Sequence, residues 1–473
     1  FEALPVMVNA DSSQTLTMRL KTTTDAYLDF CYTLPKDDYM MSMDIVGHQL
    51  SDVMPSNINA LNIHWNAKIR QQEQGRKFEQ RYAKLDYKYM DDSGIESLSE
   101  AKNDHDKASG NVQWIAFKDQ FFSTVLIAKE GFSAAELVSR MEDAPYMKSY
   151  QADLEADFSI KQDNSIALSW YLGPNKFSQL HSYNDLAQEG ESKLNLQKLV
   201  PLGSWWYSWV NRIAVIPMFN LFSSWFSSYG IIILLMTIVI KLVIFPLTFK
   251  SYQASAKMRV LKPEIDKINE KYPPEKMQER QQATMELYRK ANVSPMSGCL
   301  PMLLQMPILI AMFSFFPTAI ELRQQSFLWA HDLSTYDAIF TWQAHIPLIS
   351  WFFGNHISLF CLLMTVTNII YTYLNMQSQG SANDQMKIMK WMMYLMPVFF
   401  MYLFNDYAAG LSYYYFLSLL ITIIQTVVIR AFINDEKLLA QIHANMSKGE
   451  KNKKKKSGFA ARLERMQREQ QEY

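Results

Sequence analysis

The sequence of 473 residues has little cysteine, only scattered histidines and none of the common catalytic signatures. Its three cysteines, Cys31, Cys299 and Cys361, are too few and too far apart for a disulfide framework or a cysteine-based zinc site. Its eight histidines form no H-E-x-x-H pair, and no G-x-x-x-x-G-K-[ST] run marks a nucleotide site. We therefore expect no metal, no cofactor and no enzymatic activity.

Charge is also missing from long stretches of the second half of the chain. Three runs contain no charged residue: Ile213–Ile240, Ala291–Ile320 and Ala338–Asn383. The 46 basic and 46 acidic side chains balance overall, but residues 1–200 are net acidic and residues 201–473 are net basic. The uncharged runs exclude a single soluble domain, and an aromatic content of 14% excludes a disordered chain.

The acidic first part of the chain has the pattern of a β-domain. Apolar and polar side chains alternate in Leu16–Leu20, Ala83–Tyr89 and Leu154–Ile160, and a period of two predicts strands with one buried and one wet face. We expect an antiparallel β-sandwich, with Ser133–Met141 as a minor helix. Because the sequence starts at Phe1 without a signal peptide, we expect a processed or N-terminally truncated chain.

An aromatic stretch separates this domain from the rest of the chain. Trp205–Phe226 holds several tryptophans and phenylalanines around one arginine and one proline. Such stretches typically lie along a membrane surface, with their rings at the level of the lipid headgroups. We therefore expect an interfacial amphipathic helix over 201–228, and a buried core helix is the alternative.

Five later segments are long and apolar enough to span a membrane. A span needs about 20 mostly apolar residues to cross a hydrocarbon core of about 30 Å, and membrane bundles tolerate prolines within such helices. We expect a helical core of five spans over 229–430. The predicted spans are Tyr229–Phe249, Gly298–Phe316, Ile357–Leu374, Met389–Phe404 and Ala408–Ile429.

Basic residues are distributed unevenly between the connections of these spans. They crowd Lys250–Lys290 and the tail from Arg430, whereas Ala319–His356 contains only Arg323. The positive-inside rule places the basic connections in the cytoplasm. With five spans, the β-domain then faces the periplasm or the exterior, and the C-terminus is cytoplasmic.

The basic connection 251–293 is predicted to be a cytoplasmic helical hairpin rather than a simple connector. Apolar residues such as Met258 recur at helical spacing, and Pro273 and Pro274 suit a turn between two helices. The basic tail 431–473 carries a lysine run that could bind ribosomal RNA or anionic lipid, or could be ordinary cytoplasmic charge. This run includes Lys453, Lys454, Lys455 and Lys456.

Lys241 is a charge inside the first predicted span. It lies about 14 Å deeper than Lys250 at 1.5 Å per residue, where a lysine costs about 2.5–3.5 kcal/mol. No acidic residue occurs within the five predicted spans, so a hydrated cavity is the simplest way to accommodate the amine. Nearby polar residues could line that cavity or could form interhelical hydrogen bonds instead. They are Thr237, Gln305, Tyr415, Ser418, Thr422 and Gln425.

Several ordered motifs resemble the YidC/Oxa/Alb family of membrane protein insertases. S-P-M-S-G-C-L-P-M-L-L-Q-M-P-I begins at Ser294, K-M-R-V-L-K-P begins at Lys257, and G-L-S-Y-Y-Y begins at Gly410. The run W-I-A-F-K-D-Q-F-F at Trp114 is similar to the later strands of the large periplasmic domain of bacterial members. The resemblance therefore covers both parts of the chain.

The resemblance implies a five-span core in the bacterial inner membrane, with a hydrophilic groove that opens to the cytoplasm and the lipid. It places the cation of the groove, usually arginine, at Lys241, with Thr237 and Tyr415 in the same groove. The implied activity is the insertion and folding of nascent membrane proteins, alone or with the Sec translocon, with the ribosome and the bilayer as further partners. The matching hairpin residues are Lys257, Met258, Pro263, Pro273 and Pro274.

A channel or transporter is the alternative function, with Lys241 as an intramembrane anion site. Transporters usually contain paired repeats, and the sequence shows none.

Overall fold

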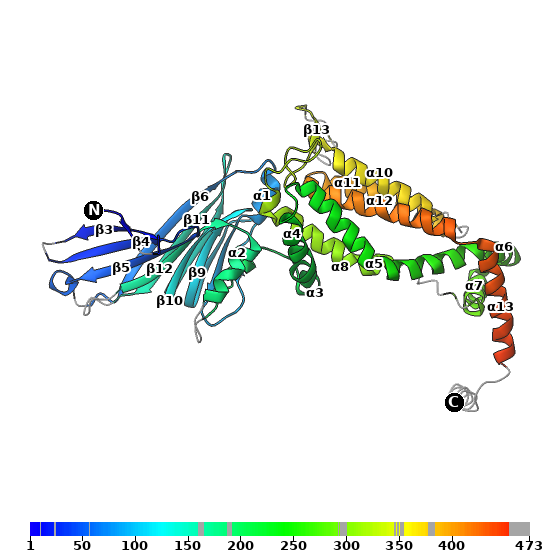
Figure 1. Cartoon of the computed structure of the whole chain (residues 1–473), viewed down its shortest axis with the longest axis horizontal. Coiled ribbons are helices and arrows are strands. Elements are labelled where there is room, and N and C mark those ends of the chain that lie inside the picture. The colour runs from blue at the N-terminus through cyan, green and yellow to red at the C-terminus, as the bar shows by residue number, and fades with distance from the viewer. Residues whose placement is uncertain are drawn as a thin grey trace.

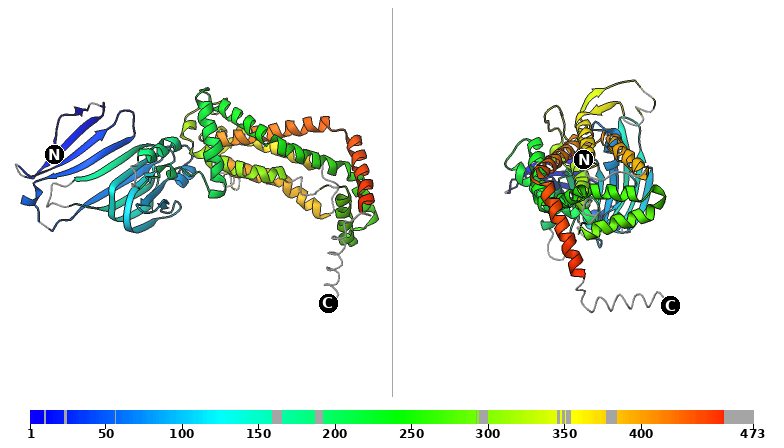
Figure 2. Two further views of the ribbon diagram at one scale, coloured as in Figure 1. Left: turned by 60° about the horizontal axis from the view of Figure 1, so that its bottom comes forward. Right: turned by 90° about the vertical axis from the view of Figure 1, so that its right-hand side faces the viewer.

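The computed structural model describes residues 1–9, 11–22, 25–55, 57–158, 165–186, 192–291, 293, 300–344, 347, 350, 354–376 and 384–453. An N-terminal β-domain and a C-terminal helical domain follow one another along the longest axis of the molecule (Figure 1). This arrangement confirms the predicted fold class. The left panel of Figure 2 shows the same succession from another side.

The β-domain contains one antiparallel sheet of 12 strands. The main strand order is β1-β3-β4-β5-β12-β10-β9-β7-β8, while β2, β6 and β11 pair outside this path. The strands are β1 (Glu2–Ala3), β2 (Met7–Val8), β3 (Gln14–Lys21), β4 (Tyr27–Leu34), β5 (Met40–His48), β6 (Ala60–Arg70), β7 (Lys84–Tyr89), β8 (Glu96–Ser97), β9 (Asp104–Lys118), β10 (Phe122–Met141), β11 (Tyr146–Asp157) and β12 (Ser165–Pro174).

The long strand β10 divides this sheet into two layers. Residues 122–128 of β10 pair with β12, residues 134–141 pair with β11, and β9 runs along the other edge. The arm formed by β6 and β11 folds over the rest of the sheet, where Trp65 of β6 stacks on Phe117 of β9 with ring centroids 3.6 Å apart. Apolar side chains from both layers form the core of this sandwich.

The predicted helix at Ser133–Met141 is wrong, because this segment is the second half of β10. Its buried side chains, Ala135, Leu137 and Ser139, recur with the period of a strand. The segment is hydrogen-bonded to β9 on one side and to β11 on the other. Pairing on both edges overrides the helical propensity of its alanine, glutamate and leucine residues.

Contacts between α1 (Arg76–Tyr82), the turn after β9 and the helical domain join the two parts of the molecule. Gln120 donates a buried hydrogen bond to the backbone oxygen of Pro317 at 2.8 Å. Arg323 forms an ion pair with Glu73 at 2.7 Å. The β-domain is therefore fixed to the near end of the helical domain.

The aromatic stretch forms α3 (Trp205–Val210), a π-helical turn (Asn211–Val215) and α4 (Ile216–Ser223). It has one buried face, which includes Phe219, and one exposed face, on which Trp205 is 87% exposed. The stretch is thus amphipathic, and its position at a membrane surface stays a prediction.

Each predicted span overlaps a helix of the second part of the chain. By length and composition, α5, α10 and α12 could cross a membrane, whereas Gln305–Thr318 and Trp391–Phe404 are shorter apolar helices. The number of five spans therefore stays a prediction. The helices are α5 (Tyr229–Val260), α8 (Leu300–Phe315), α10 (Leu359–Met376), α11 (Asp384–Phe404) and α12 (Ala409–Phe432).

The predicted hairpin is helical, but its first helix is not separate from the first span. α5 continues past its predicted end at Phe249 to Val260. Two further helices follow, and the chain turns between them at the predicted prolines. The tail begins with a helix that the sequence analysis did not predict. The remaining elements are α2 (Phe177–Ser182), α6 (Lys262–Lys271), α7 (Met277–Lys290), β13 (Ala338–Thr341), β14 (His356–Ser358) and α13 (Asp435–Lys453).

Candidate functional site

Lys241 lies in the middle of α5 and contacts α12. Its Nζ donates a hydrogen bond to Thr422 Oγ1 at 2.8 Å. Thr422 Oγ1 donates in turn to the backbone oxygen of Ser418 at 2.7 Å. Lys241 is only 6% exposed, so its amine is held inside the protein against a neutral oxygen.

Two further contacts connect α8 to the same region of α12. Gln305 Nε2 donates to Ser418 Oγ at 3.2 Å, and the Tyr415 hydroxyl donates to the backbone oxygen of Leu309 at 2.9 Å. Polar side chains of three helices therefore meet along one side of α12. We call this set the polar line; its members are Lys241, Thr422, Ser418, Gln305 and Tyr415.

Two of the predicted groove residues are not connected to Lys241. Thr237 is fully buried, but its Oγ1 donates to the backbone oxygen of Ile233 in its own helix at 2.7 Å. Gln425 is half-buried on α12, one turn beyond Thr422. Among the described residues, no hydrogen bond links either side chain to the lysine.

The charge of Lys241 has no acidic partner in the part of the chain that the structure describes. A lysine ammonium has three N–H donors. Among the described residues, one of the three bonds a protein acceptor, Thr422 Oγ1. A buried cation without an anion is costly. The polar line can therefore attract an acidic or polar group that enters between the helices.

The helical hairpin and α13 share a small apolar core. Leu261 and Ile442 are fully buried in it, and Met258 at the end of α5 packs against it. Arg259 pairs with Asp435 at 2.7 Å. The first helix of the tail is therefore docked on the hairpin.

The other predicted hairpin residues lie near helix ends. Lys257 is half-buried in the last turn of α5, and Pro263 lies in the first turn of α6. Pro273 and Pro274 precede and open the short 3-10 turn that leads into α7. These prolines occupy positions where a missing backbone N–H is tolerated.

Part of the predicted tail and of the signature motif cannot be placed. Lys453 is the last residue of α13, while Lys454, Lys455 and Lys456 lie outside the described residues. Residues 294–299 of the motif that begins at Ser294 also lie outside them.

Asn211 is a buried polar residue that the sequence analysis missed. Its Nδ2 donates to the backbone oxygens of Leu202 at 3.2 Å and of Ala311 in α8 at 2.9 Å. It opens the π-helical turn between α3 and α4, and so it ties the aromatic stretch to α8. The available signal was an asparagine within a run of mostly aromatic and aliphatic residues.

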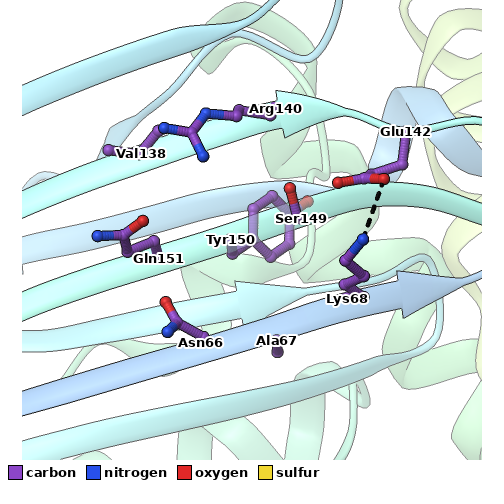
Figure 3. A pocket seen from close by; sticks show the side chains of 9 residues that line it. All are labelled: Asn66, Ala67, Lys68, Val138, Arg140, Glu142, Ser149, Tyr150 and Gln151. Carbon is purple, nitrogen blue, oxygen red and sulfur yellow. Dashed lines mark hydrogen bonds and ion pairs between the residues drawn. The ribbon is translucent and has the colours of Figure 1, made fainter.

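The β-domain has a shallow depression of about 440 Å³ on the outer face of β6, β10 and β11 (Figure 3). Lys68 and Glu142 form an ion pair across it at 3.3 Å. Its lining mixes both signs of charge and includes the hydroxyl of Ser149 beside the carboxylate of Glu142, but it contains no histidine. Within the described residues, no group of three His, Cys, Asp or Glu side chains could hold a metal ion.

Two family matches together cover almost all of the chain. Residues 5–219 match the family described as YidC periplasmic domain. Residues 221–436 match the family described as 60Kd inner membrane protein. The boundary between the matches falls within α4, close to the boundary between the two parts of the structure.

Relatives from several bacteria are similar along nearly the whole chain, and each is named membrane protein insertase YidC. The relative from Parabacteroides distasonis is 54% identical over 98% of this chain and 73% of its own length. The relative from Bacteroides fragilis is 47% identical over 98% of this chain and 74% of its own length. The relative from Porphyromonas gingivalis is 44% identical over 98% of this chain and 73% of its own length.

Proposed function

Because this chain belongs to the YidC family of inner-membrane protein insertases, we propose that it inserts nascent membrane proteins through a hydrophilic groove lined by the polar line. The observation that carries the proposal is the contact of Lys241 with Thr422, a buried cation held by a hydroxyl and not by a carboxylate. Its charge is left for a group of the substrate.

The energetic problem of insertion explains why such a groove helps. The polar end of a nascent hairpin must cross about 30 Å of hydrocarbon. Polar side chains part-way into the membrane shorten the apolar distance, and a fixed cation attracts acidic residues of the segment that crosses. The burial of apolar substrate segments and the membrane potential, about 2.3 kcal/mol per charge per 100 mV, can supply the driving force.

The proposed orientation follows from the charge pattern and from the match to a periplasmic domain. The β-domain faces the periplasm, and the hairpin, α13 and the basic tail face the cytoplasm. The domain boundaries predicted from the sequence, at residues 200, 228 and 430, belong to the same proposal.

The proposal includes the Sec translocon and the ribosome as partners, and a role in folding the inserted proteins. The lysines at 453–456 support a ribosome contact through charge alone. Removal of residues 448–473 should lower co-sedimentation with ribosomes, and unchanged co-sedimentation would contradict this part of the proposal. Such a result would not bear on the proposed insertase activity.

A channel or transporter that uses Lys241 as an anion site is the second candidate. The buried lysine supports it, but the family to which the chain belongs does not. Liposomes that contain the protein should insert substrates without leaking small solutes, whereas a channel would leak them.

The decisive test compares two substitutions of Lys241 in cells depleted of their own insertase. Lys241→Leu should impair the insertion of a substrate with an acidic translocated tail much more than that of the same substrate with a neutral tail. Lys241→Arg keeps the charge and should insert both. Leu242→Ala, on the neighbouring and 63% exposed side chain, is the matched control and should insert both. Equal insertion by Lys241→Leu and the unaltered protein would overturn the assignment.

A further inference from the structure

A small β-hairpin extends from the helical domain at the end nearest the β-domain. β13 pairs with β14 in antiparallel register, with Ala338 opposite Ser358 and Thr341 opposite His356. β14 leads without a gap into α10 at Leu359. Figure 1 and the right panel of Figure 2 show the hairpin projecting sideways from the helical domain and not along its length.

The base of this hairpin is rigidly held. Ser358 N donates to Asn405 Oδ1 at 3.0 Å, and Asn405 Nδ2 donates to the backbone oxygen of His356 at 2.9 Å. On the other side, Phe360 N donates to the buried Asp337 at 2.9 Å. These bonds tie both strands to the start of α10 and to the connection between α11 and α12. The hairpin is therefore a fixed projection whose height relative to α10 is set by the fold.

The hairpin exposes two large apolar side chains. Ile339 is 51% exposed and Phe340 is 60% exposed. The pairing shifts register between Ala338 and Phe340, so Ile339 is the extra residue of a bulge, and both side chains are left largely uncovered by the rest of the described chain. The sequence from Ala338 to Asn383, which includes the hairpin, contains no charged residue. In water this arrangement would leave an apolar projection unprotected.

We propose that the β13–β14 hairpin is a lateral membrane anchor, which lies within the interfacial layer of the leaflet at the β-domain end. The hairpin continues directly into α10, which by length and composition could cross a membrane, and this places it at the level where aromatic side chains of membrane proteins gather. The lack of charge from Ala338 to Asn383 suits this lipid interface. The anchor limits the tilt and rotation of the helical domain in the bilayer, because it acts at a distance from the bundle axis.

The test measures the lipid contact of single positions in the full chain. Each of Ile339→Cys, Phe340→Cys and Leu34→Cys is introduced after replacement of the three native cysteines. Each variant is labelled with an environment-sensitive fluorophore and reconstituted into vesicles with and without brominated phosphatidylcholine. Leu34 is a matched control, because it is an apolar strand residue of the β-domain, 48% exposed.

Brominated lipid should quench the labels at positions 339 and 340 strongly and the label at position 34 hardly at all. Quenching at one of the two hairpin positions only, or at neither, would overturn the proposal. Protection of either position that depends on added translocon would also overturn it and would identify a protein partner. The outcome is independent of Lys241, so failure of the anchor can be distinguished from failure of the proposed groove.

Discussion

The β-domain and the helical domain treat buried lysines differently. In the β-domain, Lys118 lies 3.6 Å from the carboxylate of Asp86, and both side chains are almost fully buried. In the helical domain, Lys241 is equally buried but faces the hydroxyl of Thr422. The first lysine is neutralised within the fold, whereas the second has no acidic partner among the described residues.

Two other buried lysines of the β-domain bond neutral oxygens, as Lys241 does, but each has carboxylates nearby: Asp91 and Asp92 for Lys88, and Glu100 and Asp86 for Lys148. Lys88 donates to Gln113 Oε1 at 2.7 Å and to the backbone oxygen of Tyr89 at 2.9 Å. Lys148 donates to the backbone oxygen of Ala83 at 2.8 Å, and its pKa is lowered to about 8, mainly by burial. Interior amines of the β-domain thus serve to fasten strands together. The comparison teaches that a bond to a neutral oxygen does not by itself set Lys241 apart; the difference is the lack of an acidic partner for its amine among the described residues.

The largest expected effect that could break this contrast is the removal of the partner of Lys118. Asp86→Ala leaves an uncompensated buried cation and should lower the free energy of unfolding of the β-domain by about 3–5 kcal/mol. Denaturant unfolding of the full chain, followed by tryptophan fluorescence, measures the change. Glu136→Ala removes the exposed pair with Lys107 and is the control, with an expected loss of about 0–1 kcal/mol. Equal losses in both variants would mean that the buried pair is not needed.

A smaller effect of opposite sign is expected when the amine of the helical domain is removed. Lys241→Leu replaces an unpaired buried cation by an apolar side chain and should leave stability unchanged or raise it by about 1–4 kcal/mol. The thermal unfolding midpoint in detergent measures it. A marked loss of stability would show that Lys241 is a structural fastener like Lys118, and the contrast between the domains would disappear.

A third expected effect is a pH dependence at the junction between the two domains. Glu79 is fully buried there and accepts backbone N–H bonds from Gln72 at 2.8 Å and Glu73 at 3.0 Å. Burial, with Asp119 close by, raises the pKa of Glu79 from 4.5 to about 8. The folded state therefore holds a proton that the unfolded state releases between these values, so stability should fall as the pH rises through this window.

Glu79→Gln should flatten that dependence, because the amide cannot ionise. The thermal unfolding midpoint of both proteins between pH about 5 and about 8 measures the difference. Parallel curves for the two proteins would show that Glu79 does not titrate in this range.

The sequence predicted the two-part fold well, because its signals are strong and local. Period-two alternation indicates strands with one buried face, and it located the β-domain. Long uncharged runs indicate apolar helices, and they located the helical domain. The helix predicted at Ser133–Met141 failed because pairing on both edges of β10 depends on residues far away in sequence. α13 was missed because its apolar residues, such as Ile442, are sparse and are buried only against the hairpin.

The polar line could be anticipated in its residues but not in its contacts. Spacing along one helix placed Tyr415, Ser418 and Thr422 on one face, yet only the packing of α5 against α12 selects Thr422 as the partner of Lys241. The role of Asn211 depends on the backbone of α8, which no sequence pattern reports.

The unbroken course of α5 has a mechanical consequence. At 1.5 Å per residue its 32 residues make a rod about 48 Å long, with Lys241 near the middle and the hairpin core at its far end. A partner that pulls or twists the helical hairpin at the end of α5 therefore moves the helix that carries the amine of Lys241. Pro246, within α5 between these two points, removes one backbone hydrogen bond and is where such a lever would flex.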